Sequence, residues 1–482
     1  MISEKFARSA AACLVLLPFS SGVMAQGEFA RWDVTPRVSI GQIYSDNIEQ
    51  ARPGQENSEA VTELNAGFRL DRDGPRGSGR FDYNLQGLAF WDESDSNDVY
   101  QQFSGDGNIA LAPERLFVEG SVDFRQRAVT RNGSLTDNLT IDADRTDVLA
   151  LRISPFYVQR FEDMAVGELR YAYDRVDYGS SVLNEDDSET NRFLAKLDSG
   201  PMFARIGWGL SYDYSKEKFD DGSSVERQTA EVLGRWNATE RASLFGVVGY
   251  EDNEFEQDAS RSSPDDTFWR IGATYTAATR TSFEGFAGER FFGSTWGMEL
   301  RHQVRTGRLF ASYREELTTS NVDEFELRPI RDEFGDVIFD PVTGIPLFEE
   351  PDVRTNVYLS KRFNAGFRGQ LPKTVWGVRL YDDRREYEID GSSERVTGVA
   401  GNVRWAFAPR TRLGMNARWE ESTFSDQPDR EDTIVRIGVE LGRNLGRDAD
   451  VSLEYSYRDR DSTLENLDFS ETRITATLTK FF

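Results

Sequence analysis

The chain has 482 residues, a formal net charge of −26 and a mean hydropathy of −0.57. Such an acidic chain is a poor partner for nucleic acid, because it repels the phosphates. Charged residues make up 29% of the sequence, yet 33 Phe, 17 Tyr and 9 Trp exclude a disordered chain. The length allows two or three ordinary domains or one large barrel.

The amino terminus has the pattern of a secretory signal. Lys5 and Arg8 precede an apolar stretch at 10–19, and small residues follow at Val23-Met24-Ala25. This order of basic, apolar and small residues predicts a signal peptide at 1–25. The remainder, 26–482, is predicted to be a single domain.

The only cysteine is Cys13. A lipid-modified cysteine would follow the apolar core of its signal, whereas here Leu14-Val15-Leu16-Leu17 comes after the cysteine. The predicted mature chain therefore has no disulfide and no thiol chemistry. No later stretch approaches the roughly 18–20 apolar residues of a spanning helix. An exported β protein remains, either periplasmic or secreted, or a barrel in the outer membrane.

Apolar and charged residues alternate along many segments. Leu413, Met415 and Trp419 share one parity, whereas Arg412 and Arg418 share the other. The same alternation recurs at 165–174, 227–236, 435–441 and 451–458. With their flanks these segments exceed the five or six residues that are typical of globular strands, and they match tilted strands that cross a bilayer. The pattern predicts one face toward lipid and one face toward a wet lumen.

The charged parity supplies the candidate lumen residues. They are Glu168, Arg170, Arg227, Glu231, Arg412, Arg418, Glu420, Arg436, Glu440, Glu454 and Arg458. One interpretation is a polar conduit for a hydrophilic, even anionic, substrate. The other is a network of ion pairs that fills the barrel and makes it a non-conducting scaffold.

Short and long connections alternate along the chain. Ala112-Pro113-Glu114 is a short turn, and the polar stretch from Ala128 to Asp144 is a long loop. This asymmetry is typical of outer-membrane barrels, with turns in the periplasm and loops outside. The predicted fold is all-β: a transmembrane, antiparallel, up-and-down barrel of about 22 strands, within a range of 18 to 22, in the bacterial outer membrane. Both termini are expected in the periplasm, and no plug or helical-repeat domain is expected before the first strand.

The longest irregular stretch is an expected extracellular loop at 318–352, which contains four prolines. Within it, residues 336–344 have the composition of a small hairpin. A loop of this length is uncommon without a role. It is either a constriction folded into the pore mouth or a flap on the surface.

The last strand alternates as the others do. Ile474 and Leu478 share one parity, and Glu471 and Arg473 share the other. The terminal Phe482 resembles the signal that the barrel-assembly machinery of Gram-negative bacteria reads. Lys480 departs from that signal, and near the periplasmic rim its amine would reach the lipid headgroups.

Catalysis is not expected. The only histidine, His302, shares parity with Trp296 and Leu300 and should face lipid near a rim, where a Ser-His hydrolase cannot use it. Glu420 and Glu421 are adjacent in a strand and point to opposite faces, so they do not form a glycosidase pair. The acidic loops lack the complete calcium-loop pattern, so no metal and no cofactor are expected.

Several short motifs resemble one family. They are Ile43-Tyr-Ser-Asp-Asn-Ile48, Asp144-Arg-Thr-Asp-Val148, Ile153-Ser-Pro155, the stretch from Ser199 to Trp208, and Lys361-Arg-Phe363. In their order and spacing they are similar to the outer-membrane proteins associated with the PEP-CTERM/exosortase system, among putative porins linked to exopolysaccharide genes. The resemblance implies a barrel that serves as a conduit or accessory in exopolysaccharide secretion. The implied partners are outer-membrane lipid and lipopolysaccharide, the barrel-assembly machinery, and exopolysaccharide or its export proteins.

Overall fold

The structure is a computed structural model. It describes residues 32–482 except 129–137, 142–144, 180–186, 221, 256–264, 278–279, 320–356, 389–390 and 465–466. The predicted signal peptide at 1–25 lies outside the described residues. So does the predicted loop at 318–352 with its hairpin, apart from Thr318 and Thr319, which end a strand.

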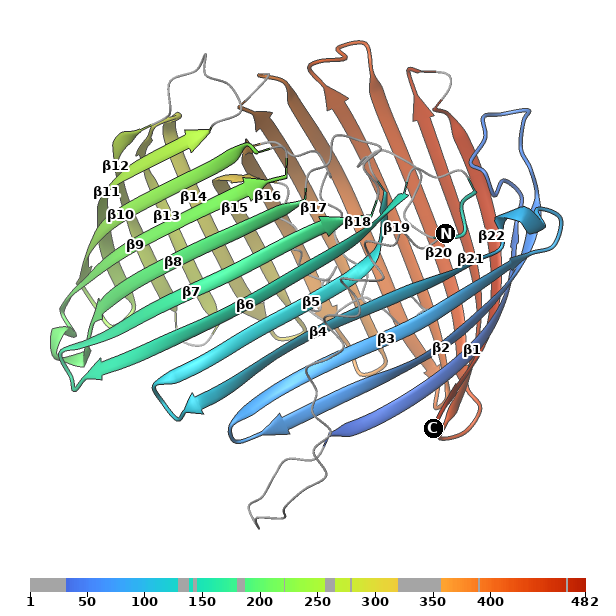
Figure 1. Ribbon diagram of the computed structural model, residues 1–482, viewed down its shortest axis with the longest axis horizontal. Coiled ribbons are helices and arrows are strands. Elements are labelled where there is room, and N and C mark those ends of the chain that lie inside the picture. Colours follow the sequence, from blue (N-terminus) through green and yellow to red (C-terminus); the bar gives the residue numbers. More distant parts are fainter. Residues whose placement is uncertain are drawn as a thin grey trace.

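The described chain forms one closed antiparallel sheet of 22 strands (Figure 1). Each strand pairs with the next in sequence, and the last pairs with the first. The strands are β1 (Asp33–Ser45), β2 (Glu59–Gly74), β3 (Gly77–Phe90), β4 (Asp98–Ala112), β5 (Leu116–Ala128), β6 (Arg145–Phe161), β7 (Ala165–Tyr178), β8 (Ser188–Ser199), β9 (Ile206–Phe219), β10 (Ser224–Asn237), β11 (Ala242–Phe255), β12 (Asp266–Ala277), β13 (Thr281–Arg290), β14 (Gly293–Val304), β15 (Gly307–Thr319), β16 (Val357–Gln370), β17 (Thr374–Tyr387), β18 (Ser393–Ala408), β19 (Thr411–Phe424), β20 (Glu431–Asn444), β21 (Ala449–Ser462) and β22 (Phe469–Phe481). The predicted class and strand number are confirmed.

The seam between β1 and β22 closes the barrel. Nine residue pairs join the two strands, from Arg37↔Phe481 to Ser45↔Arg473. The amide of Phe482 donates to the carbonyl of Pro36 at 3.0 Å, so the terminal residue also belongs to the seam. Beside it, the amine of Lys480 lies 3.6 Å from Asp448 in the preceding turn. β1 therefore begins, and β22 ends, at the same end of the barrel.

The connections alternate in length as predicted. At the end where β1 begins, which we call the turn end, a few residues join successive strands, as at 113–115 and 409–410. At the opposite, loop end, the connections are longer, as at 46–58 and 129–144. The shortest connection at the loop end is Phe291-Phe292, which joins β13 to β14 in two residues. These two strands are short, so the wall is low at this point.

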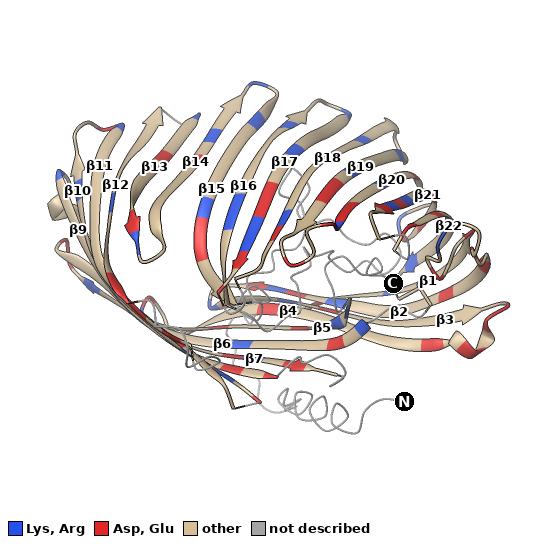
Figure 2. Cartoon of the chain, turned by 90° about the horizontal axis from the view of Figure 1, so that it is seen from above, with Lys and Arg blue, Asp and Glu red and all other residues tan. Residues whose placement is uncertain are grey.

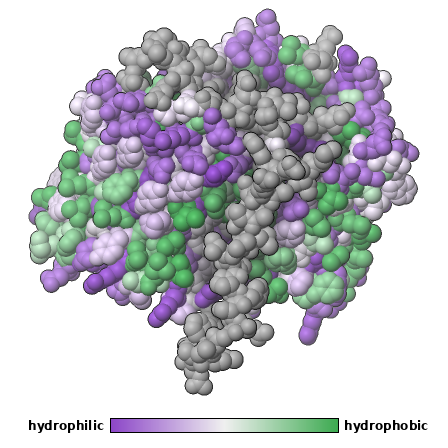
Figure 3. All heavy atoms as spheres, in the orientation of Figure 1, coloured by the Kyte–Doolittle hydropathy of each residue, from purple (hydrophilic) through white to green (hydrophobic). Residues whose placement is uncertain are grey.

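The outer face is apolar and the inner face is charged. Val232 is 56% exposed and Ile271 is 63% exposed on the outside of β10 and β12. Figure 3 shows hydrophobic side chains gathered in a band below the polar loop end, and Figure 2 shows charged residues along the strands of both walls. An apolar band around a closed sheet is the transmembrane surface of an outer-membrane barrel. Among the described residues, no helix is long and apolar enough to cross a membrane.

At the loop end, β15 separates from β14 and leans into the lumen together with β16, which stays paired with β17 up to Tyr358↔Tyr387. β14 pairs with β15 only as far as Met298↔Tyr313, whereas β15 and β16 remain paired up to Thr319↔Val357. We call residues 314–319 and 357–362 the inward hairpin. It reaches across the low wall of β13 and β14 to the inner face of β9 and β10, and Figure 2 shows β15 and β16 curving toward the opposite wall.

The inward hairpin is held by apolar packing and hydrogen bonds. Leu317 and Val357 pack against Phe219 and Val225, and all four side chains are buried. The hydroxyl of Thr319 donates to Glu217 at 2.9 Å. The hairpin therefore covers part of the inner face of β9 and β10 at the loop end.

We predict that the two faces of β10 respond oppositely to arginine. Val232→Arg places a charge in the hydrocarbon and should lower the free energy of unfolding by about 2–4 kcal/mol. Thr229→Arg should have little effect, since Thr229 lies on the inner face between Asp213 and Glu251. Urea unfolding in lipid vesicles measures both variants, and equal losses would contradict this assignment of faces.

We predict that packing stabilises the inward hairpin. Leu317→Ala removes a buried side chain and should lower the free energy of unfolding by about 2–4 kcal/mol. Leu309→Ala, on the same strand but exposed, is the matched control and should lower it by less. If the two variants unfold at the same urea concentration, Leu317 does not anchor the hairpin.

Candidate functional site

The predicted lumen residues lie on the inner face of their strands, because the residues of opposite parity are exposed outside, as Leu169, Val232, Trp419, Ile437 and Tyr455 are. Many of them form ion pairs. Arg170 pairs with Glu168 at 2.9 Å, Arg412 with Glu440 at 3.1 Å, and Arg418 with Glu420 at 2.6 Å.

The remaining candidates have other neighbours. Glu231 pairs with Arg270 at 2.6 Å, and Arg227 donates to the carbonyl of Leu317 at 3.3 Å in the inward hairpin. Glu454 stands directly opposite Glu440 across β20 and β21. Arg418, Arg436 and Arg458 stand directly opposite one another on three successive strands.

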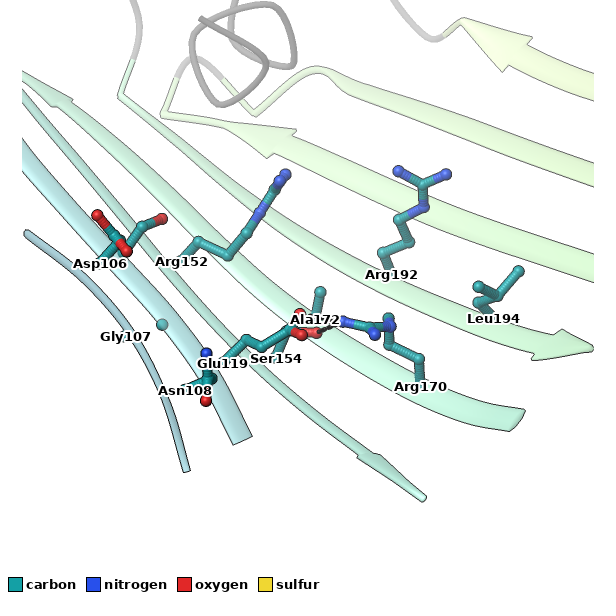
Figure 4. Close-up of a pocket in the computed structure, with 12 residues that line it drawn as sticks. Asp106, Gly107, Asn108, Glu119, Arg152, Ser154, Arg170, Ala172, Arg192 and Leu194 are labelled. Carbon is teal, nitrogen blue, oxygen red and sulfur yellow. Dashed lines mark hydrogen bonds and ion pairs between the residues drawn. The ribbon is translucent and has the colours of Figure 1, made fainter. Parts of the chain in front are cut away.

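A recess of ≈ 510 Å³ opens on the inner face of β4–β8. We call it the inner-wall recess. Figure 4 shows its charged and polar side chains projecting from successive strands. The main ones are Asp106, Asn108, Glu119, Arg152, Arg170 and Arg192.

Each arginine of the recess is held by a carboxylate. Arg152 makes two hydrogen bonds of 2.7 Å to Asp174. Arg192 makes a similar bidentate contact with Asp213, at 2.8 Å for the shorter salt bridge. Two-point contacts of this kind fix the plane of the guanidinium. The arginines are therefore fixed in position before any solute arrives.

Arg170 is the most constrained of the three. It contacts Glu119 at 2.6 Å and Glu168 at 2.9 Å, and it donates to the hydroxyl of Ser154 at 3.1 Å. Its guanidinium also lies 4.0 Å from the ring centre of Phe156. The recess thus offers fixed donors and acceptors, which suits a ligand with hydroxyl or ionic groups.

Sequence reasoning missed Glu119, Arg152 and Arg192. All three follow the period of two within β5, β6 and β8, so the same parity rule could have placed them on the inner face. It could not have placed them together, because proximity depends on the register, such as Ala172↔Arg192 across β7 and β8.

A short piece of the β5–β6 loop covers the inner wall at the loop end. Asn138 donates to Gln86 at 2.8 Å, and the amide of Ile141 donates to the carbonyl of Ile48 at 3.3 Å. Leu139 and Ile141 pack against a buried apolar cluster on β1–β3 and the β1–β2 loop, formed by Ile43, Ile48, Val61, Leu88 and Phe90. The expected constriction at 318–352 lies almost wholly outside the described residues. Residues 138–141 and the inward hairpin narrow the described mouth instead.

The buried carboxylate of Glu59 anchors a loop. It accepts hydrogen bonds from the amides of Trp91 at 2.9 Å, Asp92 at 3.1 Å and Glu93 at 3.0 Å. A carboxylate that receives several backbone amides fixes their geometry. This contact could not be predicted from the sequence, because Glu59 begins β2 whereas the amides belong to the connection between β3 and β4.

His302 lies where the parity predicted. It is on the outer face of β14 near the turn end, and its Nδ1 is 2.8 Å from the hydroxyl of Thr281 on the neighbouring strand. Within the described ranges, no group of three His, Cys, Asp or Glu side chains is arranged to hold a metal ion.

Comparison with known proteins gives matches in structure only. No family model matches the sequence, and no curated protein matches it. The fold is similar to the FrpB iron transporter from Neisseria meningitidis, with a TM-score of 0.52 and 9% identity over 95% of this chain and 83% of that chain. It is also similar to the siderophore receptor PiuA from Acinetobacter baumannii, with a TM-score of 0.51 and 9% identity over 95% of this chain and 82% of that chain. These similarities show the fold of an outer-membrane barrel.

The comparisons correct one prediction. The role in exopolysaccharide secretion is wrong, since the solved barrels to which this chain is similar include an iron transporter and siderophore receptors. The resemblance to the PEP-CTERM/exosortase family stays a prediction that no family model tests. The short motifs do not determine a role, because they are strand and turn sequences that many barrels need.

We predict that Glu59→Gln loosens the β3–β4 loop. The amide side chain keeps the shape but loses the charge, and should lower the local stability by about 1–3 kcal/mol. Hydrogen exchange at residues 91–93 should then be faster. Glu56→Gln, an exposed change in the neighbouring loop, is the control and should leave this exchange unaltered. Unchanged exchange in Glu59→Gln would contradict the anchoring role.

Proposed function

We propose that this barrel takes up a small hydrophilic solute across the outer membrane without catalysing a reaction on it. The observation that carries the proposal is the inner-wall recess, in which ion pairs hold Arg152, Arg170 and Arg192 in place beside open space. Arginines fixed in this way can bind ligand groups at little cost in conformational entropy.

The structural neighbours support uptake as the direction of transport. Those named above are an iron transporter and a siderophore receptor, and both are barrels that this chain covers by more than four fifths. At 9% identity they indicate no particular ligand for this chain. The recess supplies the argument for a polar ligand.

We also propose which partners the surface of the barrel meets. Outer-membrane lipid covers the apolar belt, and lipopolysaccharide borders the acidic loops. The assembly machinery reads the strand that ends in Phe482. Each of these partners is expected from the chemistry of the surface that it would meet.

A second candidate is a non-conducting scaffold. Two observations favour it: the inward hairpin packs on β9 and β10, and residues 138–141 pack on β1–β3. Both contacts lie at the loop end and narrow the mouth. A channel experiment separates the two candidates.

We predict that vesicles containing the barrel swell in an isotonic solution of a neutral pentose. Ser121→Trp together with Ser154→Trp fills the recess and should slow swelling several-fold, because both side chains face the lumen. Leu169→Trp, on the outer face of β7, is the control and should swell as the unaltered barrel does. If vesicles with the unaltered barrel do not swell, the scaffold is favoured. If the unaltered barrel, the double variant and the control swell equally, the recess does not lie on the route of the solute.

A further inference from the structure

An arginine row crosses three strands of the wall that faces the inner-wall recess. Arg418 on β19 is directly opposite Arg436 on β20, which is directly opposite Arg458 on β21. Neighbouring strands are about 4.8 Å apart, so the row extends over about 10 Å. In Figure 2, seen from above, β16–β21 form one arc of the barrel and β1–β8 form the other.

The surroundings of the row are positive. The row itself and the adjacent inward-facing rows on β19–β22 contain five arginines and two carboxylates, a net charge of +3. The two carboxylates are Glu420, which is 2.6 Å from Arg418, and Glu471, which is 3.9 Å from Arg458. Two rows from the arginine row toward the loop end, Asp432 pairs with Arg460 at 2.9 Å and with Arg430 at 2.8 Å. Within the row and its two adjacent rows, positive charges therefore outnumber negative ones.

The row is open to the lumen. The side chains of Arg418 and Arg458 are 34% and 22% exposed. Next to the row on the turn-end side lie Asn416, Gly438 and Ser456, which are directly opposite one another. The side-chain amide of Asn416 lies over Gly438, where a Cβ would be only 2.7 Å from it. A solute in the lumen can reach the exposed parts of Arg418 and Arg458.

Tyr381 fixes one end of the row. Its hydroxyl accepts a hydrogen bond from Nε of Arg418 at 2.8 Å. Its ring centre lies 5.2 Å from the guanidinium of Arg379 and 5.3 Å from that of Arg418. Contacts of this kind hold cations over an aromatic ring. They orient Arg418 without neutralising it.

Like charges directly opposite on neighbouring strands destabilise a sheet. At other places on the inner face the barrel brings opposite charges together, as between Arg270 and Glu231 or Arg290 and Glu251. A ligand that brings negative charge to the row would offset the repulsion and gain two-point hydrogen bonds from each guanidinium. We propose that Arg418, Arg436 and Arg458 form a binding site for solutes that carry two or more carboxylate or phosphate groups.

This inference deepens the proposed uptake function and names the class of solute. The recess on the other wall pairs its arginines with carboxylates, and its Asp106 and Glu119 accept hydrogen bonds. A solute with its acidic groups at one end and hydroxyl groups at the other would turn the acidic end toward the arginine row. The two walls together would therefore bind a polyacid with a polar remainder in preference to a simple salt.

The test is equilibrium binding to the full-length barrel folded in detergent, with citrate, pyrophosphate and acetate as probes. Citrate or pyrophosphate should bind, and acetate, with one charge, should bind far more weakly. The triple variant R418Q/R436Q/R458Q should weaken binding about tenfold or more, because it removes charge-assisted hydrogen bonds. The single variant R436Q should give a smaller loss in the same direction, and it serves if the triple variant does not fold.

The matched control is R235Q/R301Q/R308Q, which removes three exposed arginines near the turn end of β10, β14 and β15. It should bind both polyanions as the unaltered barrel does. If both triple variants weaken binding equally, the loss reflects net charge alone and the proposed site is wrong. The site is also wrong if the unaltered barrel binds neither citrate nor pyrophosphate. Binding in detergent does not depend on conduction, so a silent barrel would defeat the uptake proposal alone. Preference for citrate or for pyrophosphate identifies the acidic group.

Discussion

Every backbone amide and carbonyl inside a bilayer needs a partner within the protein, because the hydrocarbon offers none. This chain meets the requirement with a closed sheet in which β22 pairs with β1. Because the sheet is closed, successive side chains must alternate between lipid and lumen. The charged side chains of each strand must therefore point inward. The terminal strand therefore matters through its nine pairs with β1 as well as through its last residue.

Within that ring the two walls have different chemistry. On β4–β8 each arginine of the recess is matched by a carboxylate, and the result is a fixed polar surface. On β19–β21 three arginines stand opposite one another, and positive charge accumulates. The inward hairpin and residues 138–141 narrow the loop end, so a solute would enter the lumen through a narrowed mouth.

The fold could be predicted from the alternation of apolar and charged residues, because lipid on one side and water on the other impose this alternation on every strand. The strand number, the alternation of turns and loops, and the inward side of Arg170, Arg418 and Arg458 follow from it. The register does not follow from this alternation, since the pairing of distant residues depends on turn lengths and on closure of the ring. The arginine row, the recess and the Glu59 anchor all depend on register. The inward hairpin depends on the two-residue connection at Phe291-Phe292, which lowers the wall beside it.

The most direct measurement is the reaction of single cysteines along β19 with a thiol reagent that does not cross membranes. The mature chain is predicted to have no cysteine of its own, so residues 414–419 can be replaced one at a time in the full-length protein in vesicles. We predict reaction at the even positions, such as Asn416→Cys, and protection at the odd positions, such as Ala417→Cys. Reaction at both would contradict the lipid-facing belt. Protection at both would show that the inner face is not open to water.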